Sequence, residues 1–292
     1  MSYRLDLAGD APDTVREVAR EQLADAIRNL RDDRDDDPVA AVHAARKDLK
    51  KTRSLLRLAR PGMDTGMYRR ENRTLRDAGR ALSGTRDADV LVEVAEGLAE
   101  RYGGQIPETS FTALRDELAA DARAARADDG DGATDEVAAA LEGVAVRAGD
   151  WPLDDCDRDA LVAGAERAYR RGRAALAAAL DEPTDERLHD LRKRVKDLWY
   201  HARLLEDAFP RVLKAQGKAA HRLSDLLGDD HDLAVLAERV RGGTFVDDDT
   251  ILELIARRRA ELRDDAVRLA RRLYAEPPKA FRERLRAYVL IA

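Results

Sequence analysis

The sequence predicts an all-α protein, and three observations support that prediction. Alanine, leucine, arginine and acidic residues dominate the chain of 292 residues, while aromatic residues make up only 4%. Charged residues account for 38%, and apolar residues recur between them at helical spacing. Almost no segment rich in Val, Ile, Thr or Tyr alternates as a strand would. The length allows one large domain or two smaller ones with a sizeable core.

The first half of the chain is expected to contain helices that end at Pro, Gly or a run of charges. The first follows Pro12, and "DDRDDDP" at 32–38 separates it from the second. The second stops at Pro61-Gly62, the third at Gly84, and the fourth at Gly103-Gly104, because these residues disfavour helix continuation. The predicted ranges are 13–31, 42–60, 65–83, 86–102, 109–127 and 134–148.

A similar plan follows Trp151-Pro152 in the second half. Its second helix stops before Pro210, and Gly228 is expected to end the third. A short helix then precedes the loop "RGGTFVDDD". The predicted ranges are 157–180, 186–207, 211–227, 230–240, 249–274 and 278–290.

The two halves resemble each other as an internal duplication. Aligning His43 with His189 brings the pattern His-x-x-Arg-Lys-x-x-Lys of one half onto that of the other. Further on, "LSGTRDADVL" at 82–91 matches "LLGDDHDLAVL" at 226–236 with one inserted residue. We therefore predict two helical bundles related by a pseudo-twofold axis, one formed by residues 1–150 and the other by 151–292.

Both repeated motifs place a row of cations on one face of a helix. With about 100° per residue, the basic residues after His43 fall within roughly 60° of it, while Leu49, Leu55 and Leu56 lie opposite. The acids Asp48, Asp190 and Asp197 lie off the rows. Each row is about 21 Å long from its His to its last Arg. The first row consists of His43, Arg46, Lys47, Lys50 and Arg57, with Arg53 at its edge, and the second of His189, Arg192, Lys193, Lys196 and Arg203.

An ordinary solvated helix face is the alternative interpretation of either row, but such faces usually mix acids with bases. Here the same unbalanced pattern occurs twice at matched positions. Lysine is also concentrated there, since five of the eight lysines in the chain lie in these two helices. Like charges in a row repel, and a bound polyanion would offset that repulsion. The pattern therefore favours a polyanion-binding surface.

The remaining composition limits the class of protein. The net charge of −6 argues against a wholly basic nucleic-acid binder, and the low aromatic content disfavours base stacking. No stretch approaches the ~18 apolar residues of a membrane span, and the first ten residues lack the apolar core of a signal peptide. Cys156 is the only cysteine, so no internal disulfide forms. We expect a cytoplasmic protein without a membrane partner, a metal or another cofactor.

These motifs resemble the CHAD family, the conserved histidine α-helical domain. The resemblance is carried by "VHAARKDLKKTRSLLRL" with "LSGTRDADVL", and by "LHDLRKRVKDLWYHARLLE" with "LLGDDHDLAVL". The segment "AYRRGR" at 168–173 is also similar to the family. The resemblance covers roughly residues 10–290. It implies two helical bundles that face each other across a basic channel, which binds inorganic polyphosphate, and an association with polyphosphate granules.

The resemblance also implies which residues bind the ligand. It assigns the two cationic rows to polyphosphate, and adds weaker candidates from the surfaces that face them: Arg73, Arg76, Arg80, Tyr169, Arg173, Lys214, Lys218 and His221. Trp199 stands where a basic residue is expected in the second row. No residue is assigned a catalytic role. Binding is expected to favour long chains, to weaken with salt, and to strengthen as the pH falls through ~6.5 if the histidines become charged.

Two functions of other classes remain as alternatives. The first is a metal-dependent phosphohydrolase that uses the His-Asp pairs at 189–190 and 231–232. Against it, a cationic row repels a metal ion, and neighbouring residues on a helix diverge by about 100°. The second is an adaptor or RNA-binding module that uses the same cations.

Overall fold

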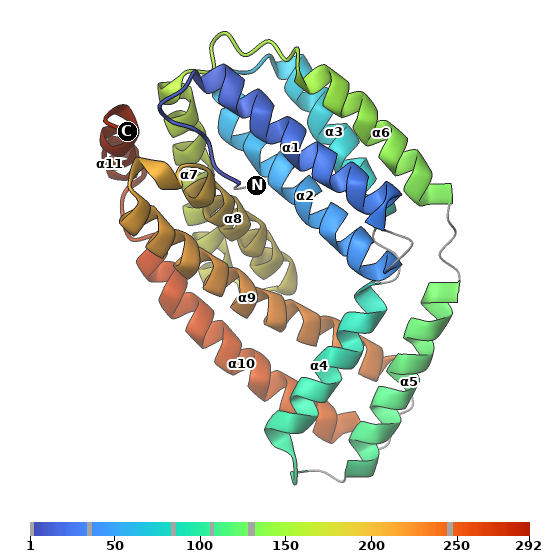
Figure 1. Ribbon diagram of the computed structural model, residues 1–292. Helices are drawn as coiled ribbons and strands as arrows, with labels where there is room; N and C mark the ends of the chain where they lie inside the picture. Colours follow the sequence, from blue (N-terminus) through green and yellow to red (C-terminus); the bar gives the residue numbers. More distant parts are fainter. Residues whose placement is uncertain (1–2, 34–36, 83–85, 106–107, 128–131, 244–247) are drawn as a thin grey trace.

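The computed structural model describes residues 3–33, 37–82, 86–105, 108–127, 132–243 and 248–292. Within these ranges, the side chains of 86–89, 108–109, 125–127 and 132–133 are left out of the description. The described residues form α-helices and short 3-10 turns without a strand, so the all-α class is confirmed (Figure 1).

Four helices of the first half pack together at one end of the molecule. They are α1 (Ala11–Arg31), α2 (Pro38–Ala59), α3 (Thr65–Ala81) and α6 (Gly132–Ala148). α2 lies against α1 and α3, and α6 covers the other side of α1 and α3. Asp37 caps α2 by accepting a hydrogen bond from the Ala40 amide at 3.0 Å, and Pro38 occupies the first turn. These contacts fix where the helix that carries the first row begins.

The other two helices of the first half form a hairpin that extends away from this bundle. They are α4 (Arg86–Tyr102) and α5 (Glu108–Ala127). Figure 1 shows the hairpin reaching the far ends of the helices of the second half. α4 packs on α9 and touches α10. Elements from the two halves are therefore interleaved.

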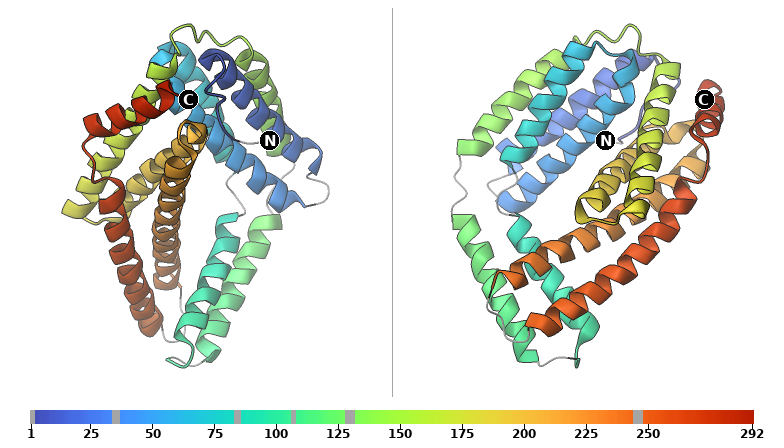
Figure 2. Two further views of the ribbon diagram at one scale, coloured as in Figure 1. Left: turned by 60° about the vertical axis from the view of Figure 1, so that its left-hand side comes forward. Right: turned by 180° about the vertical axis from the view of Figure 1, so that it is seen from behind.

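The second half begins with an antiparallel pair, α7 (Arg158–Asp181) and α8 (Asp185–Leu204). α9 (Pro210–Arg241) packs on α8, α10 (Asp248–Leu273) packs on α9, and α11 (Pro278–Leu290) returns to α7 (Figure 2). Thr184 caps α8 by accepting a hydrogen bond from the Arg187 amide at 3.3 Å. The 3-10 turns at Arg60–Gly62 and Glu206–Ala208 follow α2 and α8.

The two halves meet along a seam between α2 and the helices α7 and α8. A Cβ at Gly164 of α7 would overlap the backbone of Leu58 in α2, so only glycine allows this approach. The N-terminal segment crosses the same seam. The Tyr3 hydroxyl donates to the Lys51 carbonyl oxygen at 2.7 Å, and the Leu5 amide donates to the Leu204 carbonyl oxygen at 2.9 Å.

One helix prediction is wrong. Gly228 does not end a helix, because α9 runs unbroken from Pro210 to Arg241 and replaces the predicted pair 211–227 and 230–240. A Cβ at Gly228 would lie 2.7 Å from an Nη atom of Arg192, so this glycine makes room for a guanidinium group. The match between 82–91 and 226–236 falls largely on residues 83–89, whose side chains are not described. The internal duplication and the boundary between residues 150 and 151 stay predictions.

Candidate cationic surface on α2 and α8

The first row lies on α2, and the acid within its motif is turned away from it. Asp48 is 6% exposed and accepts hydrogen bonds from Lys51 at 2.6 Å and from Asn29 of α1 at 3.2 Å. Burial raises the pKa of Asp48, and Lys51 opposes that shift. Lys47 is exposed and makes no ion pair within the described part of the chain. His43, Arg46 and Lys50 are partly exposed.

The second row lies on α8 and is more closely surrounded than the first. Lys193 is exposed, and its Nζ atom lies 3.0 Å from a carboxylate oxygen of Asp190. Arg192 lies over the α9 backbone at Gly228. The His189 ring lies 4.7 Å from the His231 ring of α9, centroid to centroid. Lys196 is partly exposed.

His189 is neutral at pH 7 in the unliganded protein. Burial is the main cause that lowers its pKa to about 4, and the nearby Lys193, His231 and Arg192 contribute to the same shift. The pKa of His189 is therefore well below the pKa of ~6.5 of an unperturbed imidazole. A phosphate chain beside it would oppose these effects.

The last arginine of each row is engaged by groups of the protein. Nε of Arg57 lies 2.7 Å from Oδ1 of Asp197 in α8. The guanidinium carbon of Arg203 lies 5.3 Å from the centroid of the Tyr3 ring and 5.8 Å from that of Trp199, which is a cation–π arrangement. The C-terminal ends of the two rows therefore have structural partners in the unliganded protein.

The candidates on α3 lie beside the first row. Nε of Arg53 in α2 donates to the Asn72 amide oxygen at 3.2 Å, which joins α2 to α3. Burial, together with the charges of Arg57 and Arg76, lowers the pKa of Arg53 to about 10. Arg76 itself pairs with its neighbour Asp77 at 2.9 Å. Arg73 and Arg80 are exposed on the same helix.

The candidates on α9 lie beside the second row. Lys214 and Lys218 are exposed. Nδ1 of His221 lies 2.7 Å from a carboxylate oxygen of Asp225, and its ring meets the Trp199 ring edge-on at 4.1 Å. Trp199, which interrupts the basic pattern of the second row, thus contacts the histidine predicted to extend it.

Two candidates, buried Tyr169 and partly exposed Arg173, are bonded to the segment that follows α10. Tyr169 is 1% exposed, stacks on Phe281 of α11 with centroids 4.1 Å apart, and donates to the Glu276 carbonyl oxygen at 3.0 Å. Arg173 donates to the carbonyl oxygens of Tyr274 and Glu276 after the end of α10. These bonds stabilise the connection from α10 to α11, and the ligand roles of Tyr169 and Arg173 stay predictions.

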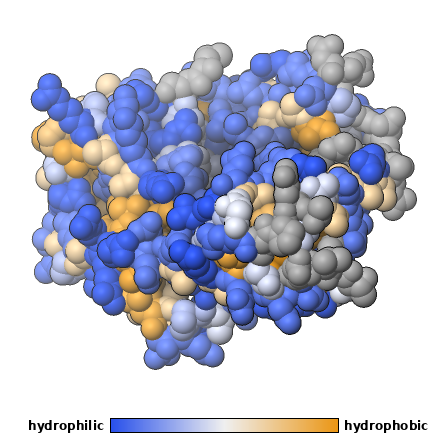
Figure 3. Space-filling view, turned by 90° about the horizontal axis from the view of Figure 1, so that it is seen from below, coloured by the Kyte–Doolittle hydropathy of each residue, from blue (hydrophilic) through white to orange (hydrophobic). Residues whose placement is uncertain are grey.

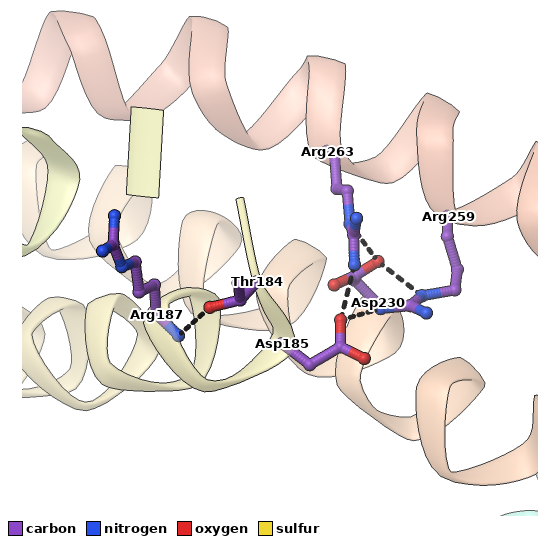
Figure 4. Close-up of polar contacts among 6 residues, drawn as sticks. All are labelled: Thr184, Asp185, Arg187, Asp230, Arg259 and Arg263. Atoms are coloured by element: carbon purple, nitrogen blue, oxygen red, sulfur yellow. Dashed lines mark hydrogen bonds and ion pairs between the residues drawn. The ribbon is translucent and has the colours of Figure 1, made fainter. Parts of the chain in front are cut away.

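Sequence reasoning missed several polar residues that join α8, α9 and α10 to one another. Asp230 of α9 is 2% exposed, and its Oδ1 accepts from Nε of Arg259 at 3.0 Å and from Nε of Arg263 at 2.9 Å. Both arginines, from α10, also bond Asp185 in the first turn of α8 (Figure 4). This cluster ties the start of α8 to α9 and α10. The two acids lie far from the two arginines in the sequence, so the sequence alone does not reveal which acid pairs with which arginine.

The His-Asp pairs of the alternative phosphohydrolase lie on α8 and α9. Within the described residues, no group of three or more His, Cys, Asp or Glu side chains is arranged to hold a metal ion. His189 and His231 are near each other, and their neighbours include Lys193 and Arg192, which repel a cation.

In the described part of the chain, no helix is long and apolar enough to cross a membrane. Hydrophilic side chains cover most of the described surface visible in Figure 3.

Comparison with known proteins identifies the family. The CHAD domain model matches residues 17–241, which is most of the chain. The chain belongs to the CHAD family. A solved structure, that of PptA from Streptomyces chartreusis, has a similar fold with a TM-score of 0.58, 19% sequence identity, and coverage of 91% of this chain and 98% of that one. The comparison with curated proteins found no match. Membership of the CHAD family supports a polyphosphate-related function.

Proposed function

We propose that this CHAD protein binds inorganic polyphosphate through the cationic rows of α2 and α8 and that it carries out no reaction on it. The observation that supports this most is the separation of charge on α2. Asp48 is buried against α1 with Lys51, while Lys47 is exposed and His43, Arg46 and Lys50 are partly exposed. α2 and α8 pack against each other, so one flexible polyanion can reach cations of both helices.

The proposed mechanism is multivalent capture in a basic channel between the bundles. An exposed contact between one cation and one phosphate contributes little in water, and salt screens it. Successive contacts along one chain add through effective concentration and through the release of counterions. Affinity should therefore rise with chain length and fall steeply with salt. This behaviour would suit a cytoplasmic protein that associates with polyphosphate granules.

The experiment is a binding titration with polyphosphates of graded length at fixed salt. The double variant Lys50→Glu/Lys196→Glu reverses one charge in each row, and we expect at least a ~100-fold loss of affinity for long chains. Lys279→Glu is the matched control, because Lys279 is an exposed lysine of α11 outside both rows. Equal affinity of the double variant and the wild type would contradict the assignment of the surface.

Two further measurements separate this proposal from its alternatives. Incubation of polyphosphate with the protein and divalent metals should release no orthophosphate above background, whereas a phosphohydrolase would release it. RNA should compete weakly with polyphosphate at equal phosphate concentration, because the rows lack exposed aromatic pairs for stacking bases. Stronger binding to RNA than to polyphosphate would favour an RNA-binding module.

A further inference from the structure

A buried carboxylate lies at the point where the two cationic helices meet. Asp197 of α8 is 2% exposed. Its Oδ1 lies 2.7 Å from Nε of Arg57 in α2, and its Oδ2 lies 2.9 Å from Nη1 of Arg194 in α8. Helical spacing places Asp197 off the second row, so its role is not evident from the pattern of cations.

The contact between Asp197 and Arg57, together with the contacts around it, forms a junction between α8 and α2. One turn further along α8, His201 donates from Nε2 to the Ser54 carbonyl oxygen of α2 at 3.1 Å. A buried carboxylate requires compensating charge, and here part of that charge comes from the opposite helix. A charge-assisted hydrogen bond from the guanidinium group of Arg57 is directional, so it restricts the position of α2 relative to α8 more than apolar contacts would.

We infer that Asp197 is a positioning residue, which holds α2 and α8 at the separation that lets one polyphosphate chain contact both rows. The inference rests on the proposed function. His43 precedes Arg57 by 14 residues, so the junction fixes one end of the rows and their other ends lie about 20 Å away along the helix. A small change in the crossing angle of α2 and α8 at the junction therefore produces a larger change in the distance between the rows at their N-terminal ends. Arg57, predicted as a ligand contact, belongs to this junction.

The consequence concerns chain length. A chain that bridges both rows gains from effective concentration only if the rows are held in a fixed relation. A chain too short to bridge contacts one row and is insensitive to that relation. Loss of the junction should thus lower affinity for long chains and leave that for short chains nearly unchanged.

The test compares Asp197→Asn with Asp230→Asn by titration of long and short polyphosphate at one salt concentration. Asp230 is the matched control, because it is equally buried at 2% and also holds two arginines, but its contacts join helices of the second half and do not reach α2. In Asp230→Asn both arginines keep Asp185 of α8 as a partner. We expect Asp197→Asn to reduce the ratio of long-chain to short-chain affinity at least ~10-fold. Asp230→Asn should keep the wild-type ratio. Circular dichroism establishes that each variant is folded at the titration temperature.

A second variant covers the case in which Asp197→Asn does not fold. Arg57→Gln removes only the contact across the seam and leaves Asp197 paired with Arg194, and it should reduce the same ratio. A wild-type ratio in the folded Asp197 or Arg57 variant, or an equal reduction in Asp230→Asn, would overturn the inference while the proposed function stands. Wild-type protein that binds neither long nor short chains would overturn both.

Discussion

Nε2 of His201 in α8 lies 3.1 Å from the carbonyl oxygen of Ser54 in α2. A carbonyl oxygen only accepts, so Nε2 carries the proton, and Nδ1 has no hydrogen-bond partner among the described atoms. His201 is 2% exposed, and burial lowers its pKa to about 4. The seam between the halves thus contains an imidazole that must stay neutral.

The first prediction follows from this pKa. Between pH ~6.5 and ~4 the unfolded chain binds a proton at His201 that the folded protein does not, so the free energy of unfolding decreases as the pH falls. The full contribution, present above pH ~6.5, is about 3 kcal/mol. Urea unfolding at pH 8 and pH 5 should show a smaller pH dependence for His201→Gln than for the wild type. Identical dependence in the two proteins would contradict the burial of a neutral imidazole.

The second prediction concerns the ion pair between Lys193 and Asp190. This pair is exposed, and it competes with phosphate for the Lys193 ammonium group. Asp190→Asn should raise polyphosphate affinity about two- to fivefold at low salt. Lys47→Gln should lower affinity more than Lys193→Gln, because Lys47 makes no ion pair within the described residues. An unchanged or lower affinity of Asp190→Asn would place the ligand elsewhere on α8.

The third prediction concerns the pH dependence of binding. His189 has a pKa of about 4 in the free protein, and nearby phosphates would raise it. Protonation then accompanies binding, so affinity should increase as the pH falls below ~6.5 toward 5. The comparison is between wild type and His189→Gln at pH 7.5 and 5.5 and constant ionic strength. Equal pH dependence of the two proteins would show that His189 takes up no proton on binding.

The fourth prediction tests the close approach of the two halves. Gly164→Ala brings a methyl group against the Leu58 backbone and should destabilise the protein by at least ~2 kcal/mol. Gly97→Ala is the control, since an added Cβ in exposed α4 meets no atom within 4 Å. It should stabilise the protein by about 0.5–1 kcal/mol, as alanine favours helix. Urea unfolding of both variants measures the difference, and a harmless Gly164→Ala would show that α2 and α7 are not in contact there.

The fifth prediction tests the placement of Tyr169. Tyr169→Phe removes the hydrogen bond to the Glu276 carbonyl and keeps the ring on Phe281, so stability should fall by about 1 kcal/mol. Polyphosphate affinity should equal that of the wild type when both proteins are folded. A loss of affinity without a loss of stability would indicate that the Tyr169 hydroxyl contacts polyphosphate.

The helices could be predicted from the sequence because their boundaries are set locally. Pro61 follows the end of α2, as the pattern of breakers indicates, whereas α2 begins at Pro38, before the predicted start at residue 42. Gly228 is the exception. Gly228 leaves room for the Arg192 side chain of the neighbouring helix α8. No local sequence pattern distinguishes a glycine that makes such room from one that ends a helix.

The composition of the site was less predictable than the fold. Helical spacing gives the direction of a side chain relative to its own helix, but the packing of two helices decides what it meets. Arg57 therefore falls on the row by spacing and meets Asp197 by packing. Tyr169 entered the set of candidates through the resemblance of "AYRRGR", and only its contacts with Phe281 and Glu276 reveal its structural role.

The packing of α4 on α9 has a consequence for how the molecule loses its structure. α9, with 32 residues, contacts α8 and α10 of its own half and α4 of the other. Separating the chain between residues 150 and 151 would expose apolar area on both fragments. If the chain arose by duplication, neither repeat is now expected to fold on its own. Unfolding should therefore occur as one cooperative transition instead of two.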